Sequence, residues 1–179
     1  MTQQTTATET TEQKPALDPA LRLTRAEAVI HRNTLWALGA GVVPVPIADL
    51  LAVIAVQVKM LKEMSDIYDV PFKEDLVKKL VASLLSGMGG VSVGAILGGS
   101  MMKLIPALGT ALGVVAVPVV AGAFTHATGR VFVMHFESGG TFLDFDPNKV
   151  RDHFRGEFEA AKDKVAQIQQ QEKASRGKT

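Results

Sequence analysis

The stretch LVASLLSGMGGVSVGAILGGSMM (residues 80–102) contains no charged residue, and after Lys103 the stretch LIPALGTALGVVAVPVVAGAFTHATG (residues 104–129) contains none either. Each stretch is long enough, at about 20 residues per span, to cross a bilayer as a helix. Lys103 and Pro106 mark the turn between them. We therefore predict an all-α protein with a central glycine-rich, apolar helical hairpin flanked by amphipathic helices.

Glycines recur at four-residue spacing in both arms of this hairpin. They are candidate helix-packing residues: Gly90, Gly94, Gly98, Gly109 and Gly113. Such spacing lets two helix backbones approach closely in lipid, whereas each glycine costs an aqueous helix roughly 1 kcal/mol relative to alanine. The spacing favours helix packing in a membrane, and the alternatives are a flexible loop or close packing inside a soluble bundle.

Three helices are predicted before the turn of the hairpin at Lys103. Thr24 and Glu27 have the spacing of a capping box, which predicts that a first helix begins at Thr24 and ends near Gly39. Pro46 suits the first turn of a second helix, and Pro71 opens a third. With aromatic residues at only 6%, we expect Val, Leu, Ala and Gly to form the core.

The second apolar arm is predicted to continue as a helix through FTHATGRVFVMHFES, with Gly139 and Gly140 as its C-terminal cap. A β-hairpin, VFVMHF–ESGG–TFLDF, is the alternative. Asp146 as N-cap and Pro147 at the first position then begin a last helix. That helix presents an apolar face at four-residue spacing: Val150, Phe154 and Phe158.

Composition divides the chain into three parts. Residues 1–20 are polar and rich in Thr, and we predict a disordered tail because they have little apolar surface to offset the entropy of ordering. Residues 21–160 form the helical membrane-associated domain, and residues 161–179 are a charged helix end that frays past Gln167. The net charge of +1 gives no electrostatic case for nucleic acid.

Four polar residues within or beside the apolar segments are candidate intramembrane or interfacial groups: Asp49, Lys103, His126 and Arg130. Asp49 either complements the helix dipole in a first turn, pairs with Lys103 or Arg130, or forms a proton or ion site. His126 and Arg130 are four residues apart and share a helix face. No metal site or cofactor is predicted, because His126 and His135 lack a completing carboxylate and the chain has no Cys.

No motif indicates catalysis. The chain has no GxxxxGK[ST] phosphate loop, and Ser138 lacks the Gly-x-Ser-x-Gly pattern of a nucleophile elbow. The acidic residues near His135, which are Glu137, Asp144 and Asp146, are of a kind common at helix ends. We predict that the protein is not an enzyme.

The charges flanking the hairpin predict its orientation. Lys78, Lys79 and Arg130 stand at its outer ends and Lys103 at its turn. The positive-inside rule places the three outer charges in the cytoplasm. The expected location is the bacterial inner membrane with both termini in the cytoplasm, and the alternative is the cytoplasm itself.

Three short segments carry a family resemblance: PVPIAD (residues 44–49), KLIP (residues 103–106) and HFESGG (residues 135–140). Together with the segments between them, they resemble the YcjF-type bacterial domain over roughly Arg25 to Phe158. That domain occurs in inner-membrane proteins and in chains that carry an Era-like or Ras-like GTPase domain. The resemblance implies membrane association and a GTPase partner, and it implies no catalytic residues.

These observations predict a non-enzymatic, membrane-associated helical protein that anchors, scaffolds or regulates, with the lipid bilayer, further copies of itself and a GTPase as partners. The first alternative is a soluble self-associating module in which the apolar hairpin is a buried core. The second is an oligomeric pore or transport element.

Overall fold

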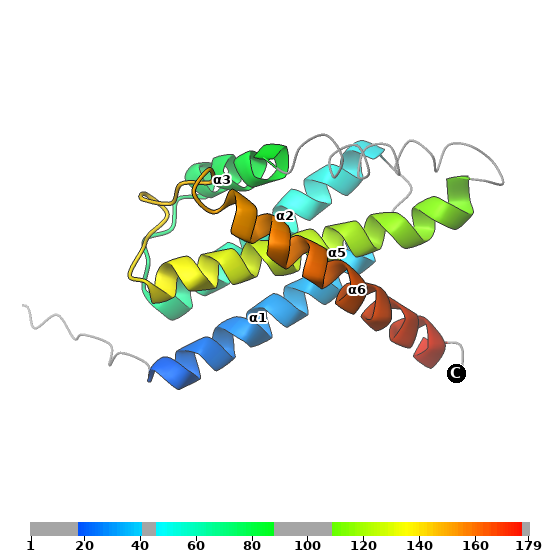
Figure 1. Ribbon diagram of the computed structural model, residues 1–179, viewed down its shortest axis with the longest axis horizontal. Helices are drawn as coiled ribbons and strands as arrows, with labels where there is room; N and C mark the ends of the chain where they lie inside the picture. The colour runs from blue at the N-terminus through cyan, green and yellow to red at the C-terminus, as the bar shows by residue number, and fades with distance from the viewer. Residues whose placement is uncertain (1–17, 41–45, 88–108, 177–179) are drawn as a thin grey trace, which may run out of the picture.

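The computed structural model describes residues 18–40, 46–87 and 109–176, and this part of the chain contains five helices and no strand. The helices are α1 (Pro19–Ala40), α2 (Pro46–Tyr68), α3 (Glu74–Gly87), α5 (Gly109–Glu137) and α6 (Arg151–Arg176). The predicted all-α class is confirmed. Helix α5 is central, because α1, α2 and α6 all contact it (Figure 1).

Side-chain pairs fix the direction of the helices around α5. Helix α1 is antiparallel to α5, since Arg22 contacts Glu137 and Leu38 lies against Gly122. Helix α2 is parallel to α5, since Gln57 bonds to Thr125 and Tyr68 bonds to Glu137. The end of α1 and the starts of α2 and α5 therefore lie at the same end of the bundle, as Figure 1 also shows.

The core contains large rings, which corrects the expectation of a core made of small aliphatic side chains. Phe132 stacks on Phe145 with ring centroids 4.2 Å apart, and it also packs against Phe136 and Phe142. Phe124 and Phe154, which are fully buried, meet edge to face between α5 and α6. The low overall aromatic content is misleading because the phenylalanines are concentrated in one part of the fold.

Helix α1 begins five residues earlier than predicted. The Oδ1 atom of Asp18 accepts hydrogen bonds from the backbone N–H groups of Ala20 and Leu21, so Asp18 is the N-cap and Pro19 the first helical residue. Thr24 lies inside the helix, where its hydroxyl donates to the Ala20 carbonyl. The prediction of a capping box at Thr24 was wrong, because Asp18, which precedes Pro19, accepts the hydrogen bonds of the first backbone N–H groups of the helix.

The end of α5 agrees with the prediction of a helix rather than a β-hairpin. Gly139 has a φ of 82°, and its N–H donates to the Phe136 carbonyl. The N–H of Gly140 donates to the His135 carbonyl. Together these bonds form a Schellman motif, which needs a residue in the left-handed conformation at the position of Gly139.

Helix α6 starts later and ends later than predicted. Asp146 caps a turn, because its Oδ1 atom accepts the N–H of Asn148 at 2.9 Å, and the helix begins only at Arg151. The prediction that the helix starts at Pro147 was therefore wrong. The helix continues past Gln167 to Arg176, and it buries Val165 and Gln169 against the bundle.

Helix α5 contains residues 109–129 of the second apolar stretch, and the side chains described in this part, from Pro118 onward, are buried or partly buried. Ala121, Ala123, Phe124 and Ala127 are fully buried. Among the described residues, we find no helix that combines the length and apolar character needed to cross a membrane. The first apolar stretch is described only as far as Gly87, so Gly90, Gly94, Gly98 and the turn at Lys103 lie outside the described residues.

Candidate functional site

The strongest asymmetry of the molecule is the position of its charges along the bundle. We define the apolar end as residues 33–40 of α1, 46–58 of α2 and 109–129 of α5, and Asp49 is its single charged residue. We define the charged end as residues 19–32, 59–68 and 130–150. The antiparallel and parallel pairings described above bring the three segments of the apolar end together, and the charged helix α6 packs against one face of this end, with Val165 next to Gly122 and Lys164 near His126.

Trp36 lies at the border between the two ends. Its side chain is 59% exposed although it is the only tryptophan of the chain. The ammonium of Lys59 lies 5.5 Å from the centroid of the indole ring. An exposed indole beside a cation combines an apolar ring with a polar neighbour, which is the environment that tryptophan prefers at a membrane–water interface.

An open groove of about 620 Å³ extends from Trp36 into the apolar end, between α1 and α2. Its lining has no charged side chain: Leu35, Trp36, Gly39, Ala52, Ala55 and Val56. The groove is wide because Gly39, Ala52 and Ala55 have small side chains, and a Cβ atom added at Gly39 would meet nothing within 4 Å. The groove therefore presents apolar surface that the described bundle leaves open.

At the charged end, side chains from three helices form a linked cluster. Arg22 contacts Glu137 at 2.9 Å, and the Tyr68 hydroxyl donates to the same carboxylate at 2.7 Å. The hydrogen bond from Arg22, opposed by desolvation, lowers the pKa of Glu137 below its ordinary value of 4.5. Burial, followed by the hydrogen bond to Glu137, raises the pKa of Tyr68. The cluster holds together the first turn of α1 and the last turns of α2 and α5.

A second set of ion pairs lies further along α1. Glu63 of α2 accepts hydrogen bonds from Arg32 at 2.5 Å and from Asn33 at 3.2 Å, and it also pairs with Lys59. Desolvation would raise the pKa of Glu63, but the hydrogen bonds from Lys59, Arg32 and Asn33 outweigh it and lower that pKa. These contacts are the last ion pairs before the apolar end begins.

Arg130 and His126, both singled out from the sequence, lie on the face of α5 that meets α1 and α6. The guanidinium of Arg130 forms an ion pair with Glu27 and lies 3.8 Å from Glu157. His126 is partly buried beside a cavity of about 210 Å³. Burial, and then the nearby Lys164, lower the pKa of His126 below 6.5. Arg130 therefore links three helices, and the burial of His126 favours its neutral form.

The other predicted site residues have these positions. Asp49 lies in the first turn of α2, the position at which a carboxylate would complement the helix dipole. Gly109 and Gly113 lie in the first two turns of α5. The surroundings of these three residues lie outside the described part of the structure. Lys103 lies there too, together with any pairing between it and Asp49.

Two glycines that the sequence analysis missed do allow close helix packing. A Cβ atom at Gly129 would lie 2.5 Å from Cγ1 of Ile30 in α1, and one at Gly122 would lie 2.7 Å from Cγ1 of Val165 in α6. They are seven residues apart, which places them on one face of α5. A search for small residues at heptad spacing, rather than only at four-residue spacing, would have found them.

A group of polar side chains is buried where α1, α2 and α5 meet: Asn33, Thr34, Gln57, Thr125 and Thr128. Gln57 donates to the Thr125 hydroxyl at 2.6 Å, and that hydroxyl donates to the Ala121 carbonyl. This connected pair favours one register between α2 and α5, because sliding either helix would break the hydrogen bond between Gln57 and Thr125.

The segment HFESGG and the residues after it have a structural role. The Nε2 atom of His135 lies 2.8 Å from the Thr141 carbonyl oxygen, and Asp144 accepts the backbone N–H of Thr141 at 2.6 Å. These bonds fold the loop so that Phe142 and Phe145 turn back into the core. Within the described residues, no group of three His, Cys, Asp or Glu side chains is arranged to hold a metal ion.

Comparison with known proteins places the chain in a family. Magnetosome membrane protein 22 of Magnetospirillum gryphiswaldense is 38% identical over 161 residues, which is 90% of this chain and 83% of that protein. No solved structure matches the chain. The GTPase link that the YcjF resemblance implies is not part of these matches and stays a prediction. The family model of a domain of unknown function, DUF697, matches residues 9–163, and the chain belongs to the DUF697 family.

Proposed function

We propose that the protein is a non-enzymatic anchor or scaffold that associates with a membrane through its apolar end. The observation that carries this proposal is the open, uncharged groove between α1 and α2, with the exposed Trp36 in its lining. A relative that is named a magnetosome membrane protein and is 38% identical over most of both chains supports it further. No reaction is assigned to the protein.

The border residues suit a bilayer interface. Trp36 would lie at the depth of the headgroups, and the groove beside it would face the acyl chains. Lys59 lies next to the indole ring, and Arg32 lies one turn before it on α1. Both are cations, which an anionic membrane surface attracts. The carboxylate of Glu63 pairs with both of these cations.

Three finer parts of the proposal rest on the sequence. The inner bacterial membrane and cytoplasmic termini come from the charges that flank the apolar stretches, and the GTPase partner comes from the YcjF resemblance. Self-association comes from the glycine spacing. Each needs its own test: protease accessibility in spheroplasts for orientation, co-purification from detergent for the partner, and sedimentation velocity for the oligomeric state.

The main test uses the single tryptophan as a depth probe. The full chain is mixed with phosphatidylcholine–phosphatidylglycerol vesicles, and the emission of Trp36 is recorded with and without brominated acyl chains. We expect a blue shift and quenching by the bromines, because the indole moves from water into the interface. Flotation of the vesicles on a sucrose gradient measures the bound fraction independently.

A matched variant places the probe at the other end of the molecule. Leu143 is 75% exposed in the loop of the charged end, so the double variant Trp36→Phe/Leu143→Trp should bind vesicles but show no quenching. Equal quenching at both positions, or no binding of the unaltered protein, contradicts the proposed orientation. A wash with alkaline carbonate then separates embedded from peripheral protein.

The second candidate function is a self-associating helical module. The burial of the described α5 side chains favours it, because these residues are already covered by α1, α2 and α6. A second copy would then cover the Trp36 groove. Concentration-dependent sedimentation without vesicle binding supports this candidate, and it predicts that Trp36→Ala yields a monomer.

A further inference from the structure

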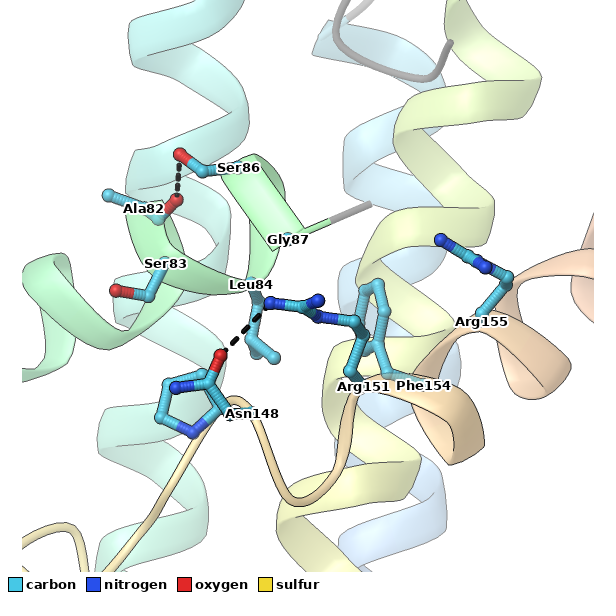
Figure 2. A pocket seen from close by; sticks show the side chains of 10 residues that line it. Ala82, Ser83, Leu84, Ser86, Gly87, Asn148, Arg151, Phe154 and Arg155 are labelled. Atoms are coloured by element: carbon cyan, nitrogen blue, oxygen red, sulfur yellow. Dashed lines mark hydrogen bonds between the residues drawn. The ribbon is translucent and has the colours of Figure 1, made fainter. Parts of the chain in front are cut away.

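A cleft of about 440 Å³ lies between the second half of α3 and the start of α6, away from the Trp36 groove (Figure 2). Polar and cationic side chains from both helices and from the turn before α6 line it: Ser83, Ser86, Asn148, Arg151 and Arg155. Leu84, Pro147 and Phe154 supply apolar wall. No carboxylate is among its lining residues, although α6 begins with an Arg-Asp pair.

The two arginines of this cleft differ from the arginines that hold the bundle together. Each of the structural arginines pairs with a glutamate on another helix: Arg22, Arg32 and Arg130. Arg151 instead donates to the neutral amide oxygen of Asn148 at 3.0 Å, and Arg155 makes no ion pair or hydrogen bond within the described residues. The positive charge of the cleft is therefore not neutralised inside the protein.

Both arginines are exposed side chains that line the cleft. Arg151 and Arg155 are one turn apart on α6, and Figure 2 shows them on either side of Phe154. The Nε atom of Arg151 would lie 3.7 Å from a Cβ atom at Gly87, so this side chain reaches across to the last residue of α3. On the α3 side, Ser83 and Ser86 line the cleft, and in Figure 2 their hydroxyl groups point away from the arginines.

Helix α6 also begins at this cleft, and its first N–H groups and dipole favour an anion. Guanidinium groups match the oxygens of phosphate with paired, charge-assisted hydrogen bonds. The volume lies in the range of small-molecule sites, roughly 300 to 1,000 Å³, so it accommodates more than a bare phosphate ion. We propose that the cleft binds a phosphate group carried by a small molecule or by a lipid headgroup, with Arg151 and Arg155 as its cationic ligands.

The inference is independent of the membrane proposal, and two arms of one experiment distinguish the source of the phosphate. In the soluble arm, inorganic phosphate and glycerol 3-phosphate are titrated into the full chain by isothermal calorimetry, with sulfate as a competing anion. In the lipid arm, the protein is floated with phosphatidylcholine vesicles that contain either phosphatidic acid or phosphatidylserine at equal surface charge. Binding of the soluble phosphates, or a preference for phosphatidic acid, supports the proposal.

Single substitutions test which residues act. Arg155→Gln should weaken phosphate binding by about tenfold, the size of one lost charge-assisted hydrogen bond. Arg25→Gln is the matched control, because Arg25 is also exposed and also lacks a partner within the described residues, yet it lies on α1 outside the cleft. Ser83→Glu adds a carboxylate at an exposed residue that lines the cleft and should abolish binding through charge repulsion, with the helical circular dichroism unchanged.

Three results would overturn the inference. They are the absence of binding in both arms, an equal loss of binding in Arg25→Gln, and binding that survives Ser83→Glu. An equal loss of binding in Arg25→Gln would mean that general surface charge, rather than the cleft, attracts the phosphate. If vesicle binding through Trp36 persists while phosphate recognition fails, the membrane proposal stands and only the cleft is refuted.

Discussion

The charged end and the apolar end of the bundle are built from the same helices, α1, α2 and α5, but their side chains make different contacts. At the charged end, glutamates and arginines pair across helices, four phenylalanine rings pack together and a Schellman motif ends α5. At the apolar end, Trp36 stays 59% exposed and an open groove lies between α1 and α2. The difference teaches that ion pairs and packed phenylalanine rings concentrate at one end, whereas the groove at the other end leaves apolar side chains uncovered by the described residues.

The largest effect is expected from the aromatic cluster of the charged end. Phe132→Ala removes a fully buried ring that packs on three other phenylalanines. We expect the free energy of unfolding to fall by about 3–5 kcal/mol, because the transfer free energy of the ring is lost and a cavity remains. Urea unfolding followed by circular dichroism measures it, and a loss below about 1 kcal/mol would show that the cluster does not hold the fold.

The next effect concerns the contact between α1 and α5 at the border of the two ends. Gly129→Ala forces Ile30 to move, since the new Cβ atom would lie 2.5 Å from its Cγ1 atom. Overpacking costs about 1–3 kcal/mol, which exceeds the gain of about 1 kcal/mol in helix propensity. Gly156→Ala is the control, because nothing lies within 4 Å of its added Cβ atom, and it should stabilise the protein by up to about 1 kcal/mol. The same sign for both variants would contradict close packing at Gly129.

A smaller effect is expected from the Arg22–Glu137–Tyr68 cluster. The pKa of Glu137 is lowered in the folded state, so its contribution to stability is present above pH 4.5 and is lost as the pH falls through the lowered value. Because these side chains are partly exposed, Glu137→Gln should cost only about 0.5–1 kcal/mol at pH 7. The variant should also flatten the decline of stability that begins as the pH falls towards 4.5 and continues through the lowered pKa. An unchanged acid profile would show that the cluster adds nothing to folding.

The smallest effect on folding is expected at the apolar end. Trp36→Ala removes a mostly exposed ring and one cation–π contact with Lys59, so the free energy of unfolding should change by less than about 1 kcal/mol. Vesicle binding should fall sharply in the same variant if the groove faces the bilayer. A large loss of stability without a change in vesicle binding would reverse the roles assigned to the two ends.

Much of the fold could be predicted from local signals. Pro46 begins α2, Gly139 and Gly140 end α5, and the apolar face of α6 is where the four-residue spacing placed it. The failures occurred where two local signals competed. Asp18 with Pro19 outcompeted Thr24 as the start of α1, and Asp146 capped a turn instead of a helix.

The candidate site was predicted less well than the fold. The sequence pointed to the hairpin glycines, whereas close packing in the described part depends on Gly122 and Gly129. Arg130 was singled out as a charge beside an apolar segment, and its contacts with Glu27 and Glu157 link residues more than twenty positions apart. Such partners cannot be found from spacing along one helix.

The sequence by itself determined that the protein is helical and that its charges avoid two long apolar stretches, because periodicity and composition are local properties of the chain. Only the tertiary structure decided that the described side chains of the second stretch lie in the core, that Trp36 stays exposed and that the uncharged segments of α1, α2 and α5 share one end. The physical reason is that burial depends on which helices pack together, and that choice is made by contacts between residues far apart in the sequence.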